Sequence, residues 1–148
     1  MKKITFLSLL CILTLSSVAQ NKFGYIDSQE LLLLMPETKT TENKVQEFAK
    51  SLEAQLGAMQ AEIQQMQQEY QANESTYDDL VKQDKVAEME GLYQRIQTFE
   101  QNARQSLQTK QQELLEPVLS KARKAIEDVA TEGDYAYIFD KSIGSILY

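Results

Sequence analysis

The stretch that decides the fold is residues 45–70, VQEFAKSLEAQLGAMQAEIQQMQQEY. Apolar side chains recur in it at steps of three and four residues, which places them along one side of an α-helix. The members of this first seam are Val45, Phe48, Leu52, Leu56, Met59, Ile63, Met66 and Tyr70. A narrow apolar stripe among Gln, Glu and Lys predicts a long amphipathic helix that needs a partner for its apolar side.

A second seam with the same steps follows further along the chain. Its members are Met89, Leu92, Ile96, Phe99, Ala103, Leu107, Leu114 and Val118. Between the seams lies the polar segment 73–79, NESTYDD, which is rich in turn and helix-capping residues. The pattern predicts a long antiparallel helical hairpin over residues 37–116, with its tip at 73–80. One uninterrupted helix is the alternative, but the polar segment and the change of seam phase favour the hairpin.

The two ends of the chain carry strand patterns. Residues 23–27, FGYID, mix aromatic and β-branched residues, and Asp27 or Ser28 is suited to cap a short helix that Pro36 ends. Residues 135–140, YAYIFD, alternate aromatics on what we expect to be one face. Because an antiparallel hairpin brings the chain ends together, these strands are predicted to form a small sheet.

The segment after the hairpin is predicted to continue as helix from Pro117 and to stop near Glu132, with Gly133 as the C-terminal cap. A last short strand is expected at 143–147. The predicted fold class is therefore mainly α with a small β base. The base comprises 20–36 and 117–148, and the helical arm comprises 37–116.

The N-terminus has the pattern of a secretory signal peptide. Lys2 and Lys3 precede the apolar run 4–15, and Ser16 to Ala19 end in small residues. We expect cleavage after Ala19, export to the periplasm, and a mature chain that starts at residue 20. A short N-terminal anchor is the alternative, although the run is shorter than the ~20 residues that span a bilayer. Cys11, the only cysteine, lies inside the apolar run.

Charge and composition exclude several classes of function. Removal of Lys2 and Lys3 leaves 13 basic against 22 acidic residues, a net charge of −9, which argues against nucleic acid as a partner. The chain has no histidine, and the mature chain has no cysteine and no glycine-rich phosphate loop. We therefore expect that the protein is not an enzyme and needs no cofactor. We also expect no catalytic, cofactor-binding or metal-binding residues.

The end segments 23–27 and 135–140, together with Met35-Pro36-Glu37, resemble the OmpH/Skp family of periplasmic outer-membrane-protein chaperones. The resemblance covers the layout of the whole mature chain. It implies a homotrimer whose end strands form a β body, with three helical arms around a cavity that holds unfolded outer-membrane β-barrel proteins. Members of the family have basic arm tips, whereas residues 74–90 here carry six acidic and two basic residues. This acidic tip argues against contact with membrane or lipopolysaccharide.

Two sets of site residues follow. The oligomerisation base is expected to consist of Phe23, Tyr25, Ile26, Tyr135, Tyr137, Ile138 and Phe139. The candidate client contacts are Tyr77, Tyr93, Met66 and Met89. Aromatic rings and flexible thioethers make adaptable contacts with varied partners. For the two methionines the alternative role, as ordinary members of the helical seams, is favoured.

The sequence thus favours an ATP-independent holdase, a chaperone that binds unfolded outer-membrane proteins and prevents their aggregation. The principal alternative is a structural or adaptor coiled-coil protein of the cell envelope, and a weaker one is an accessory subunit of an enzyme.

Overall fold

The computed structural model describes residues 21–144, and the predicted signal peptide at 1–19 lies outside them. The elements, in chain order, are strand β1 (Lys22–Ile26), helix α2 (Ser28–Leu34), helix α3 (Pro36–Asn73), the 3-10 turn η1 (Glu74–Thr76), helix α4 (Asp79–Glu132) and strand β2 (Tyr135–Asp140). The fold is therefore mainly helical with two short terminal strands, as predicted. Contacts group these elements into two compact units.

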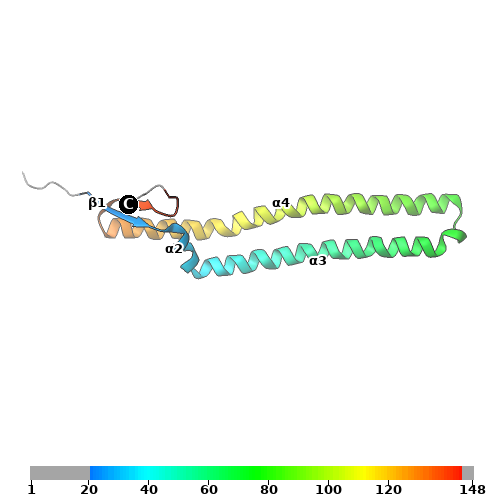
Figure 1. Ribbon diagram of the computed structural model, residues 1–148, viewed down its shortest axis with the longest axis horizontal. Helices are drawn as coiled ribbons and strands as arrows, with labels where there is room; N and C mark the ends of the chain where they lie inside the picture. Colours follow the sequence, from blue (N-terminus) through cyan, green and yellow to red (C-terminus); the bar gives the residue numbers. More distant parts are fainter. Residues whose placement is uncertain (1–20, 145–148) are drawn as a thin grey trace, which may run out of the picture. The chain divides into compact units, whose positions relative to one another are not determined.

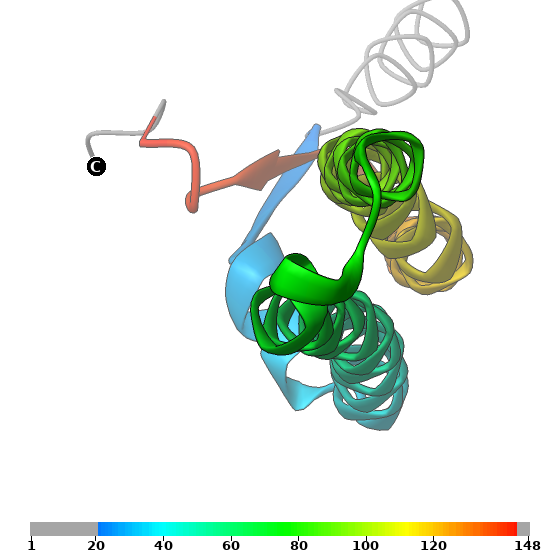
Figure 2. The ribbon, with the colours of Figure 1, turned by 90° about the vertical axis from the view of Figure 1, so that its right-hand side faces the viewer.

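The larger unit comprises residues 32–122 and is built from α3 and most of α4. The two helices lie side by side in opposite directions, and η1 connects them at the end that faces the viewer in Figure 2 (Figures 1 and 2). Contacts of the antiparallel pair recur along its length. Lys121 Nζ donates to Glu37 Oε1, Thr41 Oγ1 donates to Leu114 O at 3.3 Å, and Gln67 Nε2 donates to Tyr93 Oη.

The chain does not continue as one helix through the polar segment. Helix α3 ends at Asn73, Tyr77 is extended with φ −81° and ψ 138°, and α4 begins at Asp79. Asp78 ends the break, because its Oδ1 accepts the Val81 N–H at 2.8 Å and its carbonyl accepts the Lys82 N–H. A carboxylate that satisfies a free N–H group in the first helical turn stabilises the start of that helix.

The apolar seams form the contact between α3 and α4. All sixteen predicted seam residues are buried or half-buried. Ile63, Leu92 and Ile96 form a buried cluster, and Leu56, Met59, Met66 and Met89 pack against it. Val118 and Ala122 are buried further along α4. Two helices facing one another can enclose only a thin stripe, so most seam side chains keep part of their surface in water.

Helix α4 runs 54 residues, passes through Pro117 and ends at Glu132, where the sequence predicted its end. Proline removes one N–H and crowds the carbonyl one turn before it. At Pro117 the ring is exposed, and the nearby Leu114 carbonyl accepts the Thr41 hydroxyl from α3. The compact unit that contains this contact ends at Ala122.

Of the described residues, 21–31 and 123–144 make up the smaller unit. In it β1 and β2 pair in parallel, with Phe23 opposite Tyr137 and Tyr25 opposite Phe139. Asp27 caps α2, because its Oδ1 accepts the Glu30 N–H at 3.0 Å. The expected last strand at 143–147 is not present in its described part, since Lys141 to Gly144 form a turn. Residues 145–147 lie outside the described part.

The end of α4 differs from the prediction at Gly133. The left-handed residue is Asp134, with φ 51°, and not Gly133. Gly133 is required for a different reason, because a Cβ there would lie 2.5 Å from Tyr135 Cε2 and 3.1 Å from the Val129 carbonyl. The absence of a side chain therefore lets the Tyr135 ring pack against the end of the helix.

This packing makes two glycines respond oppositely to alanine. Gly133→Ala is expected to cost about 1–3 kcal/mol, the usual range for overpacking. Gly57→Ala is expected to stabilise by about 0.5–1 kcal/mol, because the added methyl meets nothing within 4 Å and alanine is the better helix former. Urea unfolding of the mature variants followed by circular dichroism measures both. A Gly133→Ala protein as stable as the wild type would contradict the packing.

Candidate functional site

The exposed face of the two-stranded sheet carries an aromatic cluster. Phe23 and Tyr137 stack with ring centroids 6.0 Å apart, and Phe139 lies 6.1 Å from Phe23 and 6.3 Å from Tyr137. These side chains are 57%, 64% and 45% exposed, and their neighbour Tyr25 is 78% exposed. Four exposed aromatic side chains on one small sheet form the kind of patch that marks an interaction surface.

The opposite side of the sheet packs within the smaller unit. Ile26 and Ile138 are half-buried and line an apolar groove together with Ile126 and Val129 of α4. Of the seven predicted base residues, the structure thus places Phe23, Tyr25, Tyr137 and Phe139 on the outer face. Ile26 and Ile138 lie on the inner face.

Tyr135 corrects the expectation that the aromatics of 135–140 share one face. Its ring packs on Gly24 and Gly133, and the Lys22 ammonium lies 4.1 Å from the ring centroid. The same ammonium donates to the Gly133 carbonyl at 2.7 Å. The pairing of β1 with β2 is irregular between Lys22 and Phe23, so strict alternation fails at this end of the sheet. Phe23 takes the place in the aromatic cluster that the alternation assigned to Tyr135.

A polar network joins the end of β2 to the start of α2. Asp140 Oδ1 accepts the Ser28 N–H at 3.3 Å and the Ser142 N–H at 2.9 Å, and the two serine hydroxyls lie 3.0 Å apart. Hydrogen bonds from Ser28 and then Ser142 hold the pKa of the Asp140 carboxyl well below its usual range. The network fixes the strand pairing at the end opposite Tyr135.

Acid is expected to weaken the smaller unit through this carboxylate. An unfolded aspartate has a pKa of about 3.9, and the pKa of Asp140 in the folded protein is lower. The ionised carboxyl therefore stabilises the fold above about pH 4, and this stabilisation is lost as the pH falls toward the folded-state pKa. Urea midpoints should therefore drop between about pH 4 and pH 2 in the wild type and change less in Asp140→Asn. Asp134→Asn is the matched control and should keep the wild-type dependence. Equal acid dependence in Asp140→Asn would contradict the role of the network.

The predicted client contacts occupy different environments. Met66 and Met89 pack against the Ile63–Leu92–Ile96 core and are half-buried, in keeping with their role as seam residues. Tyr77 is half-buried, with its ring centroid 6.2 Å from that of Tyr70. Tyr93 is 44% exposed, and its hydroxyl accepts a hydrogen bond from Gln67. Tyr93 is thus the most accessible of the four.

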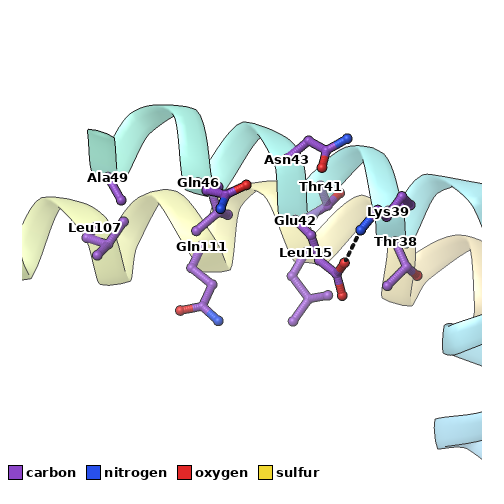
Figure 3. Close-up of a pocket in the computed structure, with 11 residues that line it drawn as sticks. Thr38, Lys39, Thr41, Glu42, Asn43, Gln46, Ala49, Leu107, Gln111 and Leu115 are labelled. Atoms are coloured by element: carbon purple, nitrogen blue, oxygen red, sulfur yellow. Dashed lines mark ion pairs between the residues drawn. The ribbon is translucent and has the colours of Figure 1, made fainter. Parts of the chain in front are cut away.

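A groove that sequence reasoning did not single out runs along the α3–α4 pair. Its first section has a volume of about 580 Å³ and lies between Thr38–Ala49 of α3 and Leu107–Leu115 of α4 (Figure 3). A second section of about 280 Å³ lies between Ala49–Leu56 and Phe99–Leu107. Ala49 and Leu107 line both sections, so the two adjoin at these residues. The available signal was Ala49, a small residue beside the seam that leaves room between larger neighbours.

Residues 21–144 contain neither a cluster of metal-binding side chains nor a membrane-spanning helix. No group of three or more His, Cys, Asp or Glu side chains in this range could hold a metal ion. No helix in this range is long and apolar enough to cross a membrane.

Long amphipathic helices, an open groove and an exposed aromatic sheet face are features of a protein that binds other proteins through its surface. The chain belongs to the OmpH-like outer membrane protein family, whose model matches residues 22–148. The match confirms the resemblance read from the end strands and extends through the helices between them. Members of this family are periplasmic chaperones of outer-membrane proteins, and the chain is of that general kind. A comparison with curated proteins found no match.

Proposed function

We propose that the protein is an ATP-independent holdase that binds unfolded outer-membrane β-barrel proteins in the periplasm and prevents their aggregation. The observation that carries the proposal is the OmpH-like match, which spans both strands and both long helices. The half-buried apolar seams and the open groove supply surface for a client without any nucleotide-driven step.

Assembly as a homotrimer through the sheet is part of the proposal. A sheet of two short strands is weak by itself, and three or more strands or added packing are needed for stability. The Phe23–Tyr137–Phe139 cluster and Tyr25 offer the aromatic surface that such packing would cover. Copies that meet here would bury apolar area that each alone leaves in water.

Client binding is proposed to use Tyr93 first, with Tyr77, Met66 and Met89 as secondary contacts. The thioethers of the two methionines border the core and can adapt to different side chains. The acidic charge around the break between α3 and α4 favours basic client segments and disfavours anionic lipid. Delivery to the periplasm is assigned to the signal peptide at 1–19, so the mature chain is proposed to start at residue 20.

An aggregation assay tests the holdase function. Dilution of a urea-unfolded barrel protein into buffer gives light scattering, which the mature protein is expected to suppress at one trimer per client without added nucleotide. The envelope adaptor, which is the alternative function, predicts no suppression. Unchanged scattering across a molar excess of the protein would refute the holdase proposal.

A further inference from the structure

We propose that the groove along α3 and α4 is the docking site for one extended client segment, a single β-strand-like stretch with alternating apolar side chains. This inference rests on the proposed holdase function and names the structural unit of the client that is recognised. The groove is defined by the lining residues of its two sections, from Thr38 to Leu56 on α3 and from Phe99 to Leu115 on α4.

The floor of the groove is apolar and incompletely covered. Phe99, Ala103 and Leu107 of α4 face Val45, Leu52 and Leu56 of α3, and all six are only half-buried. Within the described chain, no residue of 37–62 or 97–117 is fully buried. This part of the helix pair therefore retains apolar surface that a third segment can cover, in contrast to the enclosed core around Leu92.

The length of the groove matches a strand of a barrel protein. From Thr38 to Leu56 the helix rises about 27 Å at ~1.5 Å per residue. An extended chain covers that distance with about eight residues at ~3.3 Å each. Strands that span an outer membrane have ~9–11 residues, so one such strand fills the groove.

The spacing of the floor also matches an extended chain. Phe99, Ala103 and Leu107 follow one another at four-residue steps, which are ~6 Å apart along a helix. Alternate side chains of a strand that point to one face are ~6.6 Å apart. Each inward side chain of a bound strand would therefore contact the next floor residue in turn, because the two spacings differ by less than about 1 Å per step.

The rims favour an extended chain over a third helix. They carry the exposed side-chain amides of Asn43, Gln46 and Gln111, each of which can donate and accept hydrogen bonds. A helix satisfies its own backbone groups, whereas an extended segment needs partners for its N–H and C=O groups. The charged lining residues nearly balance, with two basic and three acidic side chains, which suits an uncharged segment. These are Lys39, Arg104, Glu42, Glu53 and Glu100.

Two variants of α3 separate the groove from the rest of the helix. Ala49→Glu places a carboxylate on the floor where both sections meet. Ala58→Glu makes the same change at an exposed position of the same helix. The probe is a labelled ten-residue peptide with alternating Val or Leu and Ser or Thr. Comparison peptides are a scrambled sequence of the same composition and a twenty-residue amphipathic helix. Fluorescence anisotropy with the full mature protein measures binding.

The alternating peptide is expected to bind more tightly than both comparison peptides. Ala49→Glu should weaken its binding at least tenfold, and Ala58→Glu should change it less than twofold. Equal binding by the scrambled peptide, preference for the helical peptide, or no effect of Ala49→Glu would overturn the proposal. A smaller assembly caused by Ala49→Glu would also overturn it, since the groove would then be a contact between copies.

The holdase assay distinguishes the two proposals. If the wild type suppresses aggregation and Ala49→Glu does so equally well, the groove proposal fails and the holdase function stands. If the wild type does not suppress aggregation, the holdase function itself fails.

Discussion

Leu92→Ala is expected to lower the free energy of unfolding by about 2–5 kcal/mol, the largest loss of any single truncation in the helix pair. Leu92 is 0% exposed and belongs to the buried cluster with Ile63 and Ile96. Removal of its isobutyl group leaves a cavity in a core that has few other members. Because the helices are held by a thin seam, that loss is a large share of their stability.

The matched control for this prediction is Leu80→Ala. Leu80 is on the same helix but is 68% exposed, so its truncation should change stability by less than about 0.5 kcal/mol. Urea unfolding of the mature proteins, followed by circular dichroism at 222 nm, measures both variants. Similar midpoints for Leu92→Ala and Leu80→Ala would show that the seam does not hold α3 and α4 together.

The double variant Tyr137→Ser/Phe139→Ser is expected to dissociate the proposed trimer. Tyr137 stacks on both Phe23 and Phe139 in the exposed cluster, and aromatic anchors at the centre of an interface are worth about 2 kcal/mol or more each. Two such losses weaken association about a thousandfold or more. Helix content should stay close to that of the wild type, because the seam contacts of residues 32–122 include neither residue.

The control removes the same number of exposed apolar side chains outside the sheet, as Leu80→Ser/Val86→Ser. Light scattering gives the mass of each protein, and circular dichroism gives its helix content. An unchanged mass for the sheet variant would place the contact between copies elsewhere. Complete loss of helicity would show instead that α3 and α4 have no order independent of the sheet.

Much of the fold could be predicted because periodicity reports burial directly. Every residue of the two seams is buried or half-buried, and the polar segment from Asn73 contains the break between α3 and α4. The roles of Pro36 and Asp27 could be predicted because each residue acts on the backbone next to it. Local chemistry and a repeated pattern are properties that a sequence carries without reference to distant residues.

The errors arose where distant residues decide the outcome. The left-handed residue is Asp134, and Gly133 is needed instead to make room for the Tyr135 ring. The shift of Tyr135 off the aromatic face depends on pairing with Lys22, which is 113 positions earlier in the chain.

The groove was missed for a related reason. A seam pattern identifies the side of a helix that is covered, but it does not say how completely two seams fill the space between them. The open volume at Ala49 and Leu107 depends on which side chains of α3 lie opposite which side chains of α4. Only the pairing of α3 with α4 reveals it.

The central claim is that an assembly of this chain holds an unfolded barrel protein. Its most direct test is the mass of the mature protein, measured by size-exclusion chromatography with light scattering, alone and after mixing with a urea-diluted barrel client. The predicted result is a species of three chains that, with client present, gains the mass of one client and stays soluble without nucleotide. A stable single chain whose mass is unchanged while the client precipitates would contradict the account.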